Sequence, residues 1–147
     1  MKFKIPRPLV TEHEELHETL VRATKVKGRI GEAVREVATL LHPRFVAEEE
    51  YALPPLGLLP ALAAGPVTPE MKDVLLMTDK LAADLPKMLA EHKAIVGALR
   101  KLVVAAKREK KPEWARFAEK LILHAQTEEH VLYPAAILVG ERVKARS

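Results

Sequence analysis

The chain has 147 residues, of which 48% are hydrophobic and 30% are charged, with a formal net charge of +4 at pH 7. That length fits one domain with a sizeable core, so we expect a single domain over residues 1–147. The absence of cysteine excludes disulfides, thiolate metal ligands and thiol nucleophiles. The uncharged run Ala52 to Val67 contains four prolines and is too short and too interrupted to span a bilayer. Because no signal-peptide core is recognisable, the sequence favours a cytoplasmic protein.

Apolar residues recur at helical spacing along the whole chain and no hairpin turn pair is present, so we expect helices only. The first helix is predicted from about Glu12 to Lys25, where Thr11 and Glu14 form a capping-box pattern. The second is predicted from about Ile30 to Tyr51. Pro43 should bend or split it, because its ring removes a backbone hydrogen-bond donor.

The second half of the chain repeats this organisation after a proline-rich apolar connection. A third helix is predicted from Thr68 to about Glu109, with a kink at Pro86. A fourth follows from about Pro112 to Leu132, and Pro134 is expected to interrupt it before a last short helix. Four long helices with two short links and one long crossover predict an all-α, up-down four-helix bundle with kinked helices and a short C-terminal helix.

Each long helix carries an apolar stripe that is interrupted by ionisable residues. The stripes are Val10, His13, Leu16, His17 and Leu20; Ile30, Val34, Val37, Leu41, Arg44 and Glu48; Leu85, Leu89, His92, Val96, Leu99 and Val103; Phe117, Leu121, His124, Glu128 and Leu132. A single histidine on such a face is most often a hydrogen-bonded core residue. Histidine and carboxylate facing one interior from four helices are, however, how bundles build non-haem iron or manganese sites. The spacing of His124 and Glu128 lets both project into one site, and their chemistry suits iron, manganese or zinc.

The chain also contains an internal repeat. Glu91-His92 in the third predicted helix echoes Glu12-His13 in the first. The stretch HAQTEEHVLYP, which starts at His124, echoes RFVAEEEYALP, which starts at Arg44, at an offset of eighty positions. This pattern predicts two helix hairpins of one design that pack about a pseudo-twofold axis.

These motifs resemble those of the hemerythrin-like family, also called the HHE cation-binding domain. The resemblance is carried by EH at 12–13, by F-x-x-E-E at 45–49, by EH at 91–92 and by H-x-x-x-E-E at 124–129. It covers nearly the whole chain. It implies an up-down four-helix bundle with a non-haem diiron centre that binds dioxygen or senses oxygen, iron or redox state.

Carried over by position, the resemblance implies five metal ligands in which the carboxylates bridge two metals and each histidine caps one. These ligands are His13, Glu48, His92, His124 and Glu128. The chain departs from the family at position 44, where the family's histidine is replaced by Arg44. An arginine cannot lose its charge and cannot act as a ligand.

Four interpretations of Arg44 remain open from the sequence. Two metals bind and His42 or His17 replaces the missing ligand; or one metal remains, held mainly by His92, His124 and Glu128. Alternatively no metal binds and the guanidinium pairs with Glu48 or Glu128; or Arg44 extends to the bundle end and keeps its charge in water.

The expected function is a metal-binding sensor or carrier with one or two non-haem irons, whose small ligand is O₂ or nitric oxide. The alternative is a metal-free scaffold or interaction module, in which the run LPPLGLLPALAAGP either closes the core or offers a homodimer surface. An oxidative enzyme using Tyr51 and Tyr133 is the weaker expectation, because buried tyrosine is most often packing. The short basic cluster Lys107 to Lys111 lacks a nucleic-acid recognition pattern, so no nucleic-acid partner is expected.

Overall fold

The computed structural model describes residues 3–145, and over that range the chain is helical with short links and no strand. Its four long helices are α1 (Arg7–Ala23), α2 (Gly28–Ala47), α4 (Leu75–Arg108) and α5 (Pro112–Thr127). The shorter segments are η1 (Glu48–Ala52), η2 (Pro54–Leu58), α3 (Leu59–Ala64), η3 (Pro69–Val74), η4 (Glu128–Leu132) and α6 (Tyr133–Ala145). The all-α prediction is therefore confirmed.

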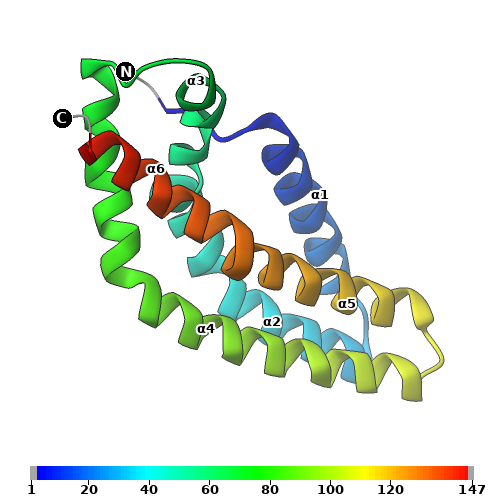
Figure 1. Cartoon of the computed structure of the whole chain (residues 1–147). Coiled ribbons are helices and arrows are strands. Elements are labelled where there is room, and N and C mark those ends of the chain that lie inside the picture. The colour runs from blue at the N-terminus through cyan, green and yellow to red at the C-terminus, as the bar shows by residue number, and fades with distance from the viewer. Residues whose placement is uncertain (1–2, 146–147) are drawn as a thin grey trace.

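The long helices lie side by side, with α4 packed against α2, α5 and α6, and α1 packed against α2. Figure 1 shows the links α1–α2 and α4–α5 at one end of the molecule and the crossover through α3 near the other end. No helix within residues 3–145 combines the length and the apolar character needed to cross a bilayer.

Proline positions explain where the observed helices differ from the predicted ones. Helix α1 begins at Arg7 rather than near Glu12, because Pro8 falls in its first turn, where a missing backbone N–H costs nothing. The predicted start at the Thr11 capping box is thus wrong. Pro43 does not split α2, and Pro86 lies within α4, which curves along its length in Figure 1.

Two segments of wider π-helix, η1 and η4, replace the predicted simple helix ends. Each begins at a glutamate of the predicted site, Glu48 or Glu128, and the amide five residues later donates to that glutamate's carbonyl. Pro134 does not interrupt the helical run, because it falls in the first turn of α6, directly after η4. π-Turns inside helices are frequent at functional sites. Their occurrence at matched places supports the internal repeat.

The buried face of α4 is rotated from the stripe predicted for it. Leu81, Met88, Ile95 and Leu102 are buried at a spacing of seven residues, whereas the predicted Leu89 is 40% exposed. A seven-residue repeat keeps one seam facing neighbours that cross at a small angle. The stripe predicted for α2 is fully buried, but His17 of α1 is exposed.

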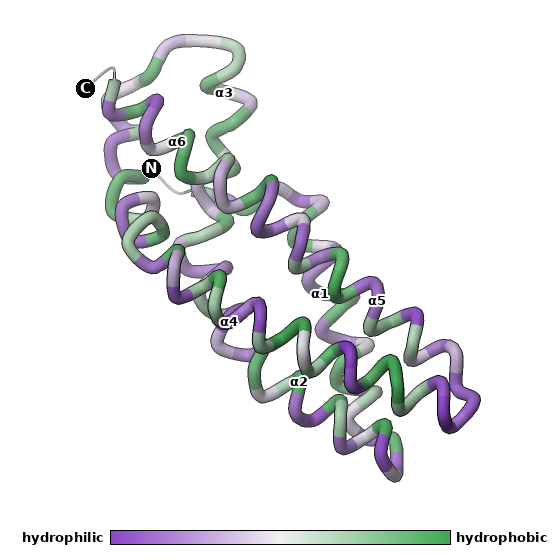
Figure 2. Tube along the Cα trace, turned by 60° about the horizontal axis from the view of Figure 1, so that its bottom comes forward, coloured by the Kyte–Doolittle hydropathy of each residue, from purple (hydrophilic) through white to green (hydrophobic). Residues whose placement is uncertain are grey.

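The crossover between α2 and α4 is buried where it begins, in η2, whereas α3 in its middle is not. Pro54, Pro55, Leu56 and Leu58 are buried, and Leu58 joins a small cluster with residues of η3 and α6. No residue of α3 is buried. Figure 2 shows hydrophobic residues in this outer segment. The first part therefore closes one end of the core, as one of the two alternatives predicted.

Candidate metal centre

Four of the five predicted ligands meet at one point inside the bundle. His13 on α1, Glu48 at the start of η1, His124 on α5 and Glu128 at the start of η4 are all buried. Each offers one ligand atom, and these atoms lie within 4.8 Å of one another. The four come from different segments of the chain, so only the tertiary fold brings them together.

Three members of this group, His13, His124 and Glu128, have a spacing close to that of ligands on one metal ion. Two atoms that each bind a metal at about 2.1 Å are separated by roughly 3.0–3.5 Å. The Nε2 atoms of His13 and His124 are 3.3 Å apart, and His124 Nε2 is 3.3 Å from Glu128 Oε2. His13 Nε2 lies slightly farther from that oxygen, at 3.7 Å. The buried Oε2 of Glu128 has no hydrogen-bond partner among the described residues, so an oxygen suited to a cation faces this point.

The fifth predicted ligand, His92 on α4, lies on the other side of Glu128. Its Nε2 is 3.6 Å from Glu128 Oε1 and 3.2 Å from the hydroxyl of Tyr133. That hydroxyl also donates to Glu48 Oε2 at 3.0 Å. The other ring nitrogen of His92, Nδ1, is 3.2 Å from Glu129 without hydrogen-bond alignment. His92 is therefore part of the polar interior but outside the group of four.

Arg44 points inward, as the stripe predicted, but the two interpretations that gave its side chain a partner or a direction do not describe its contacts. It is only 6% exposed, so extension into water is wrong. Its Nε forms an ion pair with Glu91 Oε2 at 2.6 Å, rather than with Glu48 or Glu128. Its Nη1 has no hydrogen-bond partner within residues 3–145. The guanidinium of Arg44 is thus held by the carboxylate of Glu91, which is partly exposed to solvent, beside the cluster that the four buried ligands and His92 form.

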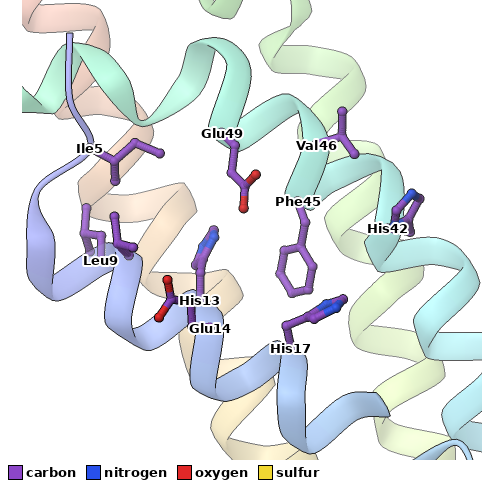
Figure 3. A pocket seen from close by; sticks show the side chains of 10 residues that line it. Ile5, Leu9, His13, Glu14, His17, His42, Phe45, Val46 and Glu49 are labelled. Carbon is purple, nitrogen blue, oxygen red and sulfur yellow. The ribbon is translucent and has the colours of Figure 1, made fainter.

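The two histidines considered as replacements, His17 and His42, lie outside the cluster. Both are exposed and line a cleft of about 510 Å³ between α1 and α2, with Phe45 between them and His13 at its inner wall. Figure 3 shows Glu49 and His13 pointing toward each other across this cleft, while His42 points away. The structure therefore gives no support to either histidine as a substitute ligand.

Burial dominates the electrostatics of the cluster. It raises the pKa of the Glu128 carboxyl, an effect that His13 partly offsets. It lowers the pKa of His124 and of His92, against the opposing influence of Glu12 and Glu129, respectively. The lowered pKa values of His92 and His124 favour the neutral imidazole, which is the form that binds a metal, and a positive charge near the Glu128 carboxylate would offset the cost of its burial.

Sequence reasoning missed the residues that orient the histidines. Glu12 Oε1 contacts Nδ1 of His124, which leaves Nε2 to face the cluster. Such a carboxylate fixes the orientation and tautomer of a metal-binding histidine. The two EH pairs carried the signal, but only their histidines were assigned a role. Tyr133 was interpreted as a packing residue, yet its hydroxyl contacts both Glu48 and His92.

Comparison with protein-family models, with characterised proteins and with solved structures finds no match for this chain. The fold and the cluster by themselves describe an all-helical protein with a buried histidine–carboxylate group that could hold a metal ion.

Proposed function

We propose that this chain is a hemerythrin-like, non-haem metal-binding protein of up-down four-helix topology, with its metal at His13, Glu48, His124 and Glu128. One observation carries the proposal: four ligand atoms from four buried side chains converge within 4.8 Å. Two histidines and two carboxylates suit iron, manganese or zinc. The resemblance in sequence favours iron among these.

The chain's own residues prepare the site in three ways. Glu12 orients His124, burial lowers the pKa of that imidazole, and Glu128 directs to the meeting point an oxygen that has no hydrogen-bond partner within residues 3–145. A bound iron would supply open coordination positions and a change of oxidation state. The cleft beside His13 gives a small molecule a place next to the site, so we propose that the protein binds or senses O₂, nitric oxide or redox state.

The test is metal content per chain, measured by plasma mass spectrometry after anaerobic loading with Fe²⁺ and removal of excess metal. We expect retained iron in the natural protein and loss of iron in a His13→Ala, His124→Ala double variant. A His17→Ala, His42→Ala double variant is the matched control, because it removes two exposed histidines nearby and should keep its iron. The absorption spectrum of the iron-loaded protein with and without O₂ or nitric oxide then tests sensing.

A second candidate function is a metal-free scaffold, and the buried Arg44 favours it. A fixed cation whose charge acts on the buried Glu128 carboxylate supplies part of the positive charge that a metal would bring. Absence of bound metal in both the natural protein and the His17→Ala, His42→Ala control would select this alternative.

A further inference from the structure

The two halves of the polar interior are structurally equivalent. The segments η1 and η4 have the same length, and each starts at one of the two carboxylates, Glu48 and Glu128. The amides of Leu53 and Tyr133 donate to those two residues' carbonyls in the same way. The fold therefore presents two related half-sites, each of which combines residues of both hairpins.

The equivalence extends to the ion pairs. In one half, the EH pair of α1 places Glu12 against His124. In the other half, the EH pair of α4 places Glu91 against Arg44. Since the repeat matches Arg44 to His124, Arg44 stands where the second half would have its ligand histidine. His92 correspondingly takes the place that His13 takes in the first half.

Glu128 faces both halves with different oxygens. Its Oε2 is 3.3 Å from His124 Nε2, whereas its Oε1 is 3.6 Å from His92 Nε2. A carboxylate placed in this way can bridge two ions. The cluster thus has the layout of a two-metal site, although only one half has a complete set of ligands.

In the second half, protein groups occupy the position of an ion. The hydroxyl of Tyr133 lies between Glu48 Oε2, at 3.0 Å, and His92 Nε2, at 3.2 Å. It thereby engages the two atoms that would have to bind a second metal. The repeat places Leu53, whose side chain has no hydroxyl, at the matching position of the first half. Arg44 adds a permanent positive charge where a histidine would otherwise bind.

We propose that this protein binds a single metal ion, and that Arg44 and the hydroxyl of Tyr133 together take the place of a second one. The inference rests on the proposed metal-binding function. A lone ion exchanges one electron at a time, so the protein would act as a mononuclear sensor or one-electron redox site and not as a two-metal dioxygen carrier.

The test compares the metal stoichiometry of the natural protein, an Arg44→His, Tyr133→Phe double variant and a Tyr51→Phe control. Tyr51 is the other buried tyrosine, but its hydroxyl donates to Asp84 instead of to the cluster. Each protein is loaded with Mn²⁺, and bound manganese is counted by plasma mass spectrometry. Electron paramagnetic resonance then separates isolated ions from spin-coupled pairs.

We expect one isolated Mn²⁺ in the natural protein and in the control, and two coupled ions in the double variant. Two ions in the natural protein would overturn the single-metal inference but leave the metal-binding function intact. No retained ion in the natural protein would overturn both. A folded double variant that still binds one ion would refute the blocking role of Arg44 and Tyr133. Should the double variant not fold, the count and resonance spectrum of the natural protein still decide whether it holds one ion.

Discussion

Replacing Glu128 by glutamine should affect the metal-free and the metal-bound protein in opposite directions. Glu128 is 3% exposed, burial raises the pKa of its carboxyl, and its Oε2 lacks a hydrogen-bond partner among the described residues. A glutamine keeps the shape, removes the buried charge and adds an amide that can donate to a nearby imidazole nitrogen. The metal-free variant should therefore be more stable than the natural protein.

The magnitude follows from the cost of burying a charge. Burying a polar group without a compensating hydrogen bond costs about 1–3 kcal/mol in mutational data on proteins. Allowing for the imidazoles at 3.3–3.7 Å, we expect a gain of about 2 kcal/mol. At roughly 2–4 °C per kcal/mol for a domain of this size, Tm rises by about 6 °C. Metal at about 100 times its Kd stabilises the natural protein by ~2.7 kcal/mol, and the variant loses that stabilisation.

The assay is thermal unfolding followed by circular dichroism at pH 7.5, with chelator and with Mn²⁺. Glu119→Gln is the control, because Glu119 is exposed on α5, the helix that directly precedes η4. The Tm of this variant should match that of the natural protein in both conditions. The gain from Glu128→Gln should shrink as the pH is lowered and disappear well below pH 4, where the carboxyl is protonated in the folded and unfolded states alike. A metal-free Glu128→Gln protein that is less stable than the natural one would refute the reasoning.

Three further predictions concern the surroundings of the cluster. Glu12→Gln should weaken metal binding about 10–100-fold, because it releases His124. Glu91→Gln removes the ion-pair partner of Arg44 and should leave the metal affinity near the natural value. Calorimetric titration with metal measures both affinities. Burial lowers the pKa of His124, so on acidification this histidine is protonated in the unfolded chain before it is protonated in the folded one. The metal-free protein should therefore lose stability against urea as the pH falls below 6.5. A free energy of unfolding that stays unchanged from pH 7.5 to 5.5 would contradict this. In the same assay, Gly31→Ala should cost on the order of 2 kcal/mol, because a backbone carbonyl occupies the space of the added methyl group. Gly97→Ala should instead stabilise α4 by about 0.5–1 kcal/mol, because its added methyl group meets nothing within 4 Å. Equal effects of the two substitutions would contradict the packing described.

Local sequence patterns predicted the helices but not all of their ends. The spacing of apolar residues indicated every long helix, because helical periodicity is a property of neighbouring residues. The start of α1 at Arg7 and the continuous helix through Pro134 were not predicted, because the effect of a proline depends on where in a turn it falls. The π-turns at Glu48 and Glu128 had no recognisable local signal, although the repeat indicated that the two places would be alike.

Candidate ligands were likewise predicted as a set of inward residues rather than as a site. Histidine and glutamate on apolar stripes indicated His13, Glu48, His92, His124 and Glu128, and all five are buried. Their division into a group of four and an outlying His92 depends on how far the helices are rotated about their axes. Helical spacing in one segment says nothing about that rotation, as the displaced stripe of α4 shows.

The sequence by itself determined that the chain is helical, that it contains a repeated hairpin, and that an arginine replaces a histidine in one repeat. Only the tertiary structure decided that this arginine pairs with Glu91 and that Tyr133 places its hydroxyl between Glu48 and His92. The physical reason is that these contacts join residues 41 to 85 positions apart, and their distances are set by the packing of whole helices. Which half of the cluster offers space for a metal is therefore a property of the fold.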